Sequence, residues 1–299
     1  IKANPNLEYE VGKDAKGNSL KRGSVKSDYL QGQVTKAMNS PVLRYGVLTK
    51  NFNIWMSNAL SWCNLEAWAQ CGATYSLDDL RGAEVVYGGL DLASVSDLTS
   101  LTLLAIMPDG EKRLWSRSWI PEERIIAAKQ DRGVPYDLWV QQGWLIATQG
   151  NVTDYNSIHT DLTGRFDRDG KKLSEGLLEI LPIKTIAADD WSIHQFLKDL
   201  QEEWHGVFAG MRQGFKTLSP AMKELERLYL GGMIKHDHNP VLSWAMGNVV
   251  AVIDPAENIK PDKKKSSEKI DPAVAAMMSV GAMLADDDET DTTPQLLVF

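Results

Sequence analysis

Three aspartates stand at the ends of well-separated apolar segments of the sequence. Asp91 ends the run VVYGGLD, Asp189 follows the run TIAA, and Asp271 opens the run DPAVAAMM. A carboxylate in such a place is costly to desolvate unless another group compensates its charge. If the three converge, hard cations would compensate them, because carboxylate ligands select Mg²⁺ or Mn²⁺ over zinc. Two such ions about 4 Å apart can activate water and stabilise the leaving oxygen in phosphodiester cleavage.

Each of these acids also has an ordinary structural interpretation. Asp91 could be a turn residue at a strand end. Asp271 followed by Pro272 is a common way to start a helix. Asp190 adjoins Asp189, and in an extended segment only one of the two can point into a given site. We favour Asp189, because it directly follows the apolar run.

Three further residues are candidates for the surroundings of such a site. Asp97, which follows the ASVSD turn, is either a supporting acid or a turn cap. His236 and His238, in KHDHNP, precede an apolar stretch and could flank the site. The alternative is that they are surface or core-edge histidines.

A basic run lies immediately before Asp271. The formal net charge of -8 argues against nucleic-acid binding, but its distribution matters more, because much of the deficit lies in DDDETD near the C-terminus. The segment KPDKKKSSEK contains five lysines against two acids. Either it is a solvated loop, or it binds an anionic ligand beside the acid. The lysines are Lys260, Lys263, Lys264, Lys265 and Lys269.

The elements that must position these residues alternate between strands and helices. The β-rich runs Val85–Leu92, Thr99–Met107 and Arg113–Ile120, with a PDG turn before the last, predict two antiparallel hairpins. Ile183–Ala188 predicts a short strand ending at Asp189. The apolar run Val241–Ile253 predicts another strand.

Helices are predicted between and after these strands. The predicted helices are residues 29–38, 122–129, 136–142, one capped by Ser192 that runs to Trp204, one opened by Ser219-Pro220 and stopped by Gly231-Gly232, and one beginning at Asp271. Strands, crossover helices and terminal helices together predict an α/β fold, a mixed sheet covered by helices on both faces.

Length and composition predict a large domain and a smaller part. With 299 residues and 43% hydrophobic side chains, the chain can bury a sizeable core. We expect a connector over residues 1–82, a main domain over 83–285 and an acidic tail over 286–299. The chain begins at Ile1, so we expect a fragment of a longer protein. No signal peptide or membrane span is predicted, and Cys63 and Cys71 are expected to be buried free thiols.

Several segments, taken in order, resemble one known family. They are YGGLDLASVSDLTSL, VPYDLWVQQGWLIATQGNVTDY, IAADDW, MRQGFKTLSPAMKELERLYLGGMIKHDHNPVLSWAMGNVV, NIKPDKKKS and KIDPAVAAMM. This order is similar to that in the large terminase subunit of tailed bacteriophages, from about Asn51 to Met283. The resemblance implies an RNase H-like fold and an endonuclease that cuts concatemeric double-stranded DNA during packaging. It also implies that Asp91, Asp189 and Asp271 are the acids that bind two Mg²⁺ or Mn²⁺ ions.

The sequence departs from the family in two places. The family usually has Asp-Pro-Trp where this chain has Asp189-Asp190-Trp191. A full-length subunit also has an N-terminal ATPase domain with a G-x-x-x-x-G-K-[ST] phosphate loop, and that motif does not occur here. ATPase activity is therefore not expected from this chain, and residues 1–82 resemble the stretch that joins the ATPase to the nuclease.

The resemblance also implies partners and leaves alternatives. The implied partners are double-stranded DNA, the portal protein, the small terminase subunit and the ATPase domain of the same polypeptide, in the host cytoplasm and without a membrane. The acidic tail followed by QLLVF either packs on its own domain or docks the motor on the portal. One rival function is another RNase H-like enzyme, a resolvase or an integrase-type recombinase. The other is a non-catalytic module that docks on the portal or on DNA.

Overall fold

The chain forms two compact units, residues 1–64 and 65–299. The computed structural model describes residues 9–23, 25–39, 47, 61–92, 97–131, 134–189, 194–266 and 268–290. The division falls earlier than the predicted boundary at residue 82. The reason is that α3 (Leu65–Gln70) packs on α9 and α10 of the second unit. Its Trp68 is buried there, with its ring edge-on to that of Tyr229 at 6.1 Å.

The first unit contains a hairpin and a helix. Strands β1 (Tyr9–Lys13) and β2 (Ser19–Arg22) pair antiparallel. Asp14 holds the turn between them, because its carboxylate accepts hydrogen bonds from the backbone of Lys16 and Asn18. Helix α1 spans Ser27–Asn39, which confirms the helix predicted over residues 29–38.

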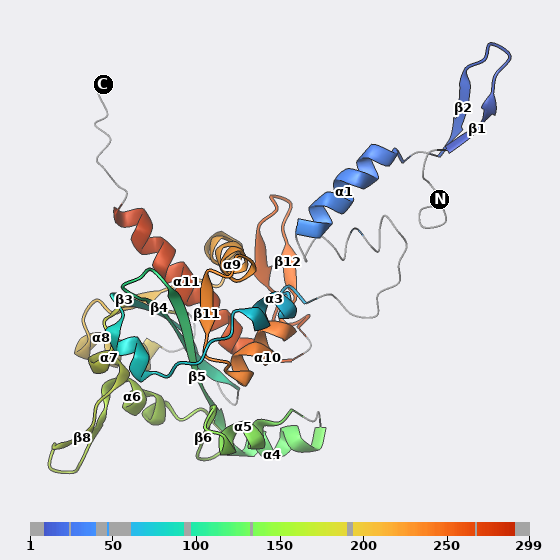
Figure 1. Ribbon diagram of the computed structural model, residues 1–299. Helices are drawn as coiled ribbons and strands as arrows, with labels where there is room; N and C mark the ends of the chain where they lie inside the picture. The colour runs from blue at the N-terminus through green and yellow to red at the C-terminus, as the bar shows by residue number, and fades with distance from the viewer. Residues whose placement is uncertain are drawn as a thin grey trace, which may run out of the picture. The chain divides into compact units, whose positions relative to one another are not determined.

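A mixed sheet organises the second unit (Figure 1). Within the described residues it has seven strands in the order β10-β9-β3-β4-β5-β11, with β6 also paired to β5. The strands are β3 (Val85–Asp91), β4 (Thr99–Ile106), β5 (Lys112–Pro121), β6 (Leu145–Thr148), β9 (Ile183–Ala188), β10 (Phe208–Gly210) and β11 (Ile234–His236). Both predicted hairpins are confirmed, since β3 pairs antiparallel with β4 and β4 with β5. The other strands join in parallel.

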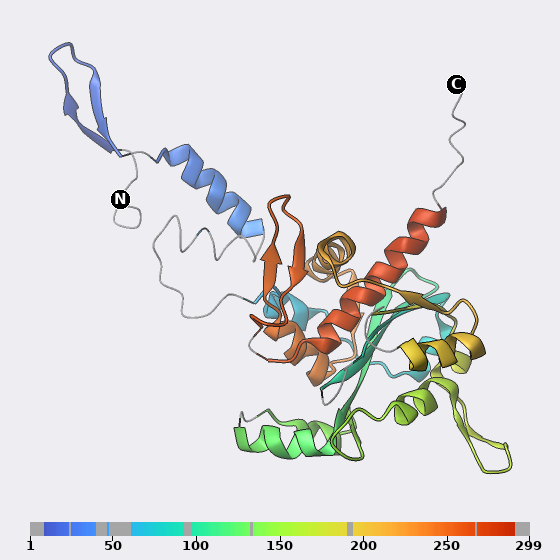
Figure 2. The same cartoon turned by 180° about the vertical axis from the view of Figure 1, so that it is seen from behind.

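Helices cover both faces of this sheet. On one face, α6 (Tyr155–Thr163), α7 (Leu177–Ile180) and α8 (His194–Glu203) pack on a large apolar cluster. On the other face, α11 (Asp271–Thr290) crosses β3, β4 and β9 (Figure 2). The predicted architecture, helices on both faces of a mixed sheet, is confirmed.

The remaining elements lie around this core. They are η1 (Asp78–Gly82), α4 (Glu122–Asp131), α5 (Tyr136–Gln141), α9 (Phe215–Leu230), α10 (Pro240–Asn248) and the antiparallel hairpins β7 (Arg165–Phe166) with β8 (Lys172–Ser174) and β12 (Ala251–Ile253) with β13 (Ile259–Pro261). The predicted helices at 122–129 and 136–142 correspond to α4 and α5. Helix α8 ends at Glu203 as predicted, but its predicted cap Ser192 lies outside the described residues.

Two predicted elements differ from the structure. Helix α9 starts at Phe215, before the predicted start at Ser219-Pro220, so that Pro220 lies inside the helix. The strand predicted over Val241–Ile253 is wrong: most of it is helix α10. Asn239 caps this helix by accepting hydrogen bonds from the backbone of the next turn, and Pro240 is its first residue, a favoured start for a helix.

The close approach of α11 to the sheet depends on a glycine. An added Cβ on Gly89 of β3 would lie 2.0 Å from the carbonyl oxygen of Ala275 and 2.7 Å from the amide nitrogen of Ser279. The helix backbone therefore rests directly on the strand. This explains why position 89 holds a glycine.

Helix α11 also extends further than expected. It continues to Thr290, so the predicted tail at 286–299 begins inside a helix, and residues 291–299 lie outside the described part of the chain. Asp286 fixes this end of the helix, because it accepts a hydrogen bond from the Tyr87 hydroxyl at 2.6 Å and pairs with Lys184.

Two remaining expectations concern thiols and membranes. Cys63 and Cys71 are both buried and free of disulfides, as predicted. Among the helices of the described residues, none is both long enough and apolar enough to cross a bilayer.

We predict that Gly89→Ala destabilises the second unit by about 3 kcal/mol, because a side chain there forces strand and helix apart and overpacking a core costs about 1–3 kcal/mol. Gly82→Ala is the matched control, since an added Cβ there meets no atom within 4 Å. Urea unfolding of the two variants measures the difference. Equal stability of both variants would show that α11 does not rest on β3 as described.

Candidate active site

Asp91 is a buried carboxylate with both oxygens engaged. It ends β3 and is only 2% exposed. Its Oδ1 accepts a hydrogen bond from Gln213 Nε2 at 2.9 Å, and its Oδ2 accepts one from Lys263 Nζ at 2.8 Å. Gln213 lies between β10 and α9, whereas Lys263 lies between β13 and α11. Two segments far apart in sequence therefore hold this acid from two sides.

Asp271 is the second buried carboxylate. It is the first residue of α11 and is 8% exposed. Its Oδ1 is 3.3 Å from Lys263 Nζ. Burial and then the negative charge of Asp91 raise the pKa of Asp271 to about 7, although the ammonium of Lys263 acts against them. A negative charge at a helix N-terminus is favoured by the helix dipole, which also helps to hold this acid in place.

Lys263 joins the two acids through one ammonium group. Burial lowers its pKa, but the charges of Asp91 and Asp271 outweigh this and raise the pKa above its ordinary value. The side chain is still 45% exposed, so the ammonium is reached from solvent. The sequence predicts that this lysine contacts phosphate, and in the structure its ammonium lies between two predicted metal ligands.

Asp189 directly follows β9, the strand next to β3. Ala188 of β9 is in register with Leu90 of β3, so Asp189 and Asp91 each come one residue later. Adjacent strands are about 4.8 Å apart, which brings the two acids to the same edge of the sheet. Asp189 is half-buried, and Asp190 lies outside the described residues. In the part of the chain that the structure describes, no three His, Cys, Asp or Glu side chains form a ready-made metal site.

Asp97 adds a third negative charge close to Asp271. Its Oδ2 is 2.5 Å from Lys269 Nζ. Its charge is also one of the causes that raise the pKa of Asp271. The position is consistent with the predicted role of a supporting acid, and it takes up a second lysine of the basic run.

The other three lysines of the run face outward or pack on the surface. Lys260 Nζ lies 5.0 Å from the centre of the Phe215 ring, a cation–π contact. Lys264 and Lys265 are exposed, and Lys265 lies 3.7 Å from Asp262. Of the predicted DNA-binding lysines, these three therefore remain at the surface, while Lys263 and Lys269 are paired with acids.

His236 does not flank the acids. It lies on β11, which β4 and β5 separate from β3. Its ring is buried and stacks on that of Trp68 at 4.4 Å, and its Nε2 is 2.9 Å from the Trp68 carbonyl oxygen. Burial lowers the pKa of this imidazole. Of the two roles that the sequence leaves open, the structure therefore shows the core-edge one, in which His236 attaches α3 to the edge of the sheet.

Two polar features of the site were not predicted from sequence. One is Gln213, which carries no sequence signal beyond its place in a polar loop. The other is a row of buried hydroxyls on the sheet next to Asp91. Ser100 is in register with Asp91 and bonds Ser118 at 2.9 Å, and Thr102 donates to the carbonyl oxygen of Pro272 at 3.2 Å. The alternation of hydroxyl and apolar residues in TSLTLLAI could have indicated this row.

Comparison with known proteins gives consistent matches. The family model described as "Terminase large subunit, endonuclease domain" matches residues 1–287. The chain is 32% identical to the large terminase subunit of Enterobacteria phage HK97 over 254 residues, which are 84% of this chain and 47% of that protein. It is 29% identical to Protein YmfN of Escherichia coli (strain K12) over 301 residues, 97% of this chain and 60% of that protein.

A solved structure agrees with these matches. The crystal structure of the HK97 bacteriophage large terminase matches with a TM-score of 0.63 and 29% identity, over 86% of this chain and 50% of that chain. The fold is RNase H-like, as predicted. The chain spans about half the length of the curated relatives it matches.

We predict that Lys263→Met lowers the free energy of unfolding by about 1–2 kcal/mol at pH 8, because it strips two buried carboxylates of a cation that is itself partly in solvent. The pKa of Asp271 is raised on folding, so the folded state holds its proton more tightly and loses stability as the pH rises from about 4 to 7. The loss caused by Lys263→Met should therefore shrink at pH 5.

Lys264→Met is the matched control, since its exposed side chain has no carboxylate partner among the described residues. Chemical denaturation at pH 5 and pH 8 measures both variants. A pH-independent loss, or an equal loss in the control, would contradict the shared-ammonium description.

Proposed function

The chain belongs to the terminase large-subunit family, as its endonuclease domain, and we propose that it cuts concatemeric double-stranded phage DNA by metal-dependent phosphodiester hydrolysis. The observation that carries this proposal is the pair of buried carboxylates, Asp91 and Asp271, that share one cation. Asp189 at the neighbouring strand end is the third acid.

The chemistry of this group suits a hard divalent cation. All three acids offer carboxylate oxygens, the donors that Mg²⁺ and Mn²⁺ prefer. Asp91 and Asp271 are buried, and among the described residues they share a single ammonium, that of Lys263. The two carboxylates therefore stabilise positive charge between them. We propose that Asp91, Asp189 and Asp271 hold two Mg²⁺ or Mn²⁺ ions, whose chemistry is to activate water and to stabilise the leaving oxygen.

The chain's own residues prepare this site for its substrate. Gln213 donates a hydrogen bond to Oδ1 of Asp91 and so orients this carboxylate. Because the amide is neutral, it does not cancel the negative charge of Asp91. Lys263 offsets the repulsion between Asp91 and Asp271, and its partial exposure lets it turn towards a phosphate. The hydroxyl of Thr102 anchors the first turn of α11, which fixes where Asp271 points.

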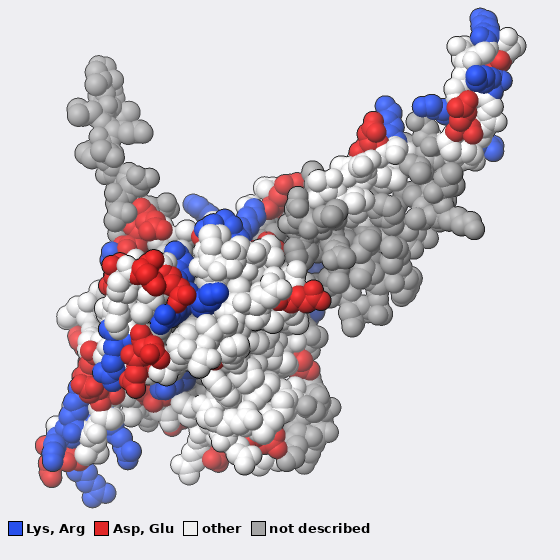
Figure 3. Space-filling view, in the orientation of Figure 1, with Lys and Arg blue, Asp and Glu red and all other residues white. Residues whose placement is uncertain are grey.

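The surface lysines near the site suit a DNA backbone. Lys260 lies on β13, and Lys264 and Lys265 lie in the segment that leads from β13 to Asp271. Lysines contact phosphates without reading bases. Charges of both signs mix elsewhere, as on the β7–β8 hairpin at the lower left of Figure 3. We propose that these three lysines bind the phosphates of the duplex beside the cut.

The wider role in packaging is also a proposal, because the chain covers about half of its relatives. The proposed partners are an ATPase domain of the same polypeptide, the small terminase subunit and the portal protein, in the host cytoplasm. The proposed portal contact is the tail 286–299, of which residues 291–299 lie outside the described residues and Asp286 is engaged with Tyr87.

We predict that Asp91→Asn, Asp189→Asn and Asp271→Asn each reduce plasmid cleavage in Mg²⁺ or Mn²⁺ by about 1,000-fold or more, since loss of a metal ligand removes several kcal/mol of transition-state stabilisation. Asp190→Asn should be much milder. The control is Asp169→Asn, an exposed acid at the turn of the β7–β8 hairpin.

Gel assays of supercoiled plasmid, with unfolding curves for each variant, test this prediction. Normal cleavage by any one of the three variants removes that residue from the site. Equal loss in the Asp189 and Asp190 variants would refute our choice between them. No metal-dependent cleavage by the unsubstituted chain would contradict the nuclease assignment.

A further inference from the structure

A groove of about 510 Å³ opens at the β10 edge of the sheet. It lies between β9, the edge strand β10 and the helices α9 and α11. Thr185 and Ala187 of β9, Thr217 of α9, and Ala282 and Ala285 of α11 contribute to its lining. The small side chains keep it open, which allows a chain-like ligand to lie along it.

Two of the segments that line the groove also lead to the carboxylate site. Ala187 of β9 lines the groove, and Asp189 follows it by two residues, directly after the end of the strand. Arg212 lines the groove, and its neighbour Gln213 donates to Asp91 at 2.9 Å.

The polar groups of the groove suit a phosphodiester. The guanidinium of Arg212 is exposed and has no hydrogen bond or ion pair with any described residue. The hydroxyls of Thr185 and Thr217 likewise have no partner in the described part of the chain. The acid in the lining, Asp286, is offset by its ion pair with Lys184 and by the Tyr87 hydroxyl. Its charge therefore does not repel an anion strongly.

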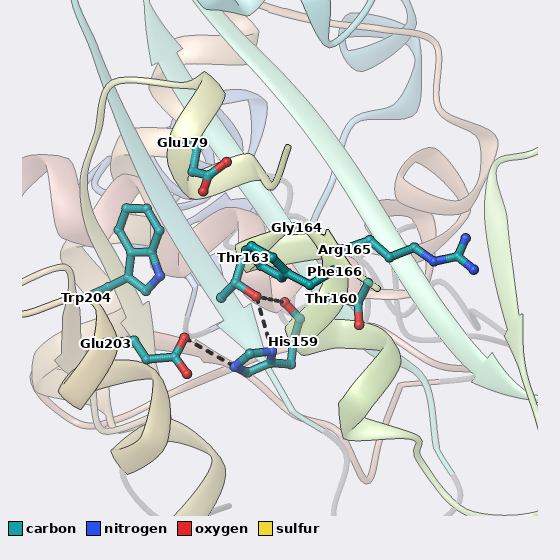
Figure 4. Close-up of a pocket in the computed structure, with 9 residues that line it drawn as sticks. All are labelled: His159, Thr160, Thr163, Gly164, Arg165, Phe166, Glu179, Glu203 and Trp204. Carbon is teal, nitrogen blue, oxygen red and sulfur yellow. Dashed lines mark hydrogen bonds and ion pairs between the residues drawn. The ribbon is translucent and has the colours of Figure 1, made fainter. Parts of the chain in front are cut away.

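A second pocket lacks these properties. It is lined by residues of α6, β7 and α8, including His159, Glu203 and Arg165. Figure 4 shows His159 bonded within the pocket, to Glu203 at 3.4 Å and to Thr163, while Arg165 points away. His159 and Glu203 pair with each other and Arg165 points out of the pocket, so the pocket offers little to a phosphate.

We propose that the groove between β9–β10 and α9–α11 binds the sugar–phosphate backbone of the DNA strand that is cut, with Arg212 on a phosphate about one or two nucleotides from the cleaved bond. Arginine suits this role, because its planar fork matches the geometry of phosphate oxygens. This inference rests on the proposed function, since it takes the nearby acids as the cleavage site.

Binding of a fluorescent duplex to the chain carrying Asp271→Asn, which should not cut, tests the inference. Arg212→Gln should weaken binding about tenfold at low salt and reduce the slope of log affinity against log salt by about one. Ala285→Phe, which places a ring in the groove from an exposed helical position, should also weaken binding. Arg168→Gln, on the turn of the β7–β8 hairpin, is the matched control and should bind normally.

An unchanged salt slope for Arg212→Gln, or normal binding by Ala285→Phe, overturns the inference and leaves the groove to a protein ligand or to none. The proposed function fails separately, through an absence of metal-dependent cleavage in the unsubstituted chain. Loss of binding in the Arg212 variant without any cleavage by the unsubstituted chain would keep the groove as a DNA site and reject the nuclease assignment. Unfolding curves show whether the Ala285 variant is folded.

Discussion

Two buried carboxylates that share one ammonium group are the interaction on which the rest of this structure depends. Asp91 ends a central strand and Asp271 begins a helix. Burying each carboxylate costs desolvation free energy, and bringing the two charges together adds repulsion. The structure brings them together because α11 rests on β3 at Gly89, where no side chain separates helix and strand. Lys263 then offsets the repulsion with a single charge. Sheet, helix and loop are therefore coupled through one ionic contact.

The residues of the candidate active site come from segments that are distant in sequence and meet at one edge of the sheet. The loop after β10 supplies Gln213 and Arg212, and the loop after β13 supplies Lys263. Gln213 and Lys263 each hold one oxygen of Asp91. The loop after β10 also presents the guanidinium of Arg212 at the surface. A site built this way can keep its acids fixed while its rim stays open to a long substrate, as cutting within a duplex requires.

The sequence predicts the strands and helices of the sheet better than it predicts the side-chain contacts of the site. Apolar runs and turns identify β3, β4, β5 and β9, because strand periodicity is local, and the same signals place Asp91 and Asp189 at strand ends. The partner of Asp91 could not be foreseen, since Lys263 is far along the chain and looked like a phosphate contact. For His236 the sequence leaves two roles open, and the structure shows the core-edge one, because its stacking on Trp68 is a tertiary contact that no local pattern reveals. Helix α10 was missed although Asn239-Pro240 carried a capping signal that the apolar run obscured.

The most direct test of the central claim is the position of metal in a crystal of the chain soaked in Mn²⁺. The account predicts anomalous difference density between Asp91, Asp189 and Asp271, with the Lys263 ammonium displaced from the shared position. Mn²⁺ density elsewhere on the molecule, with Lys263 still bridging Asp91 and Asp271 at saturating metal, would contradict it.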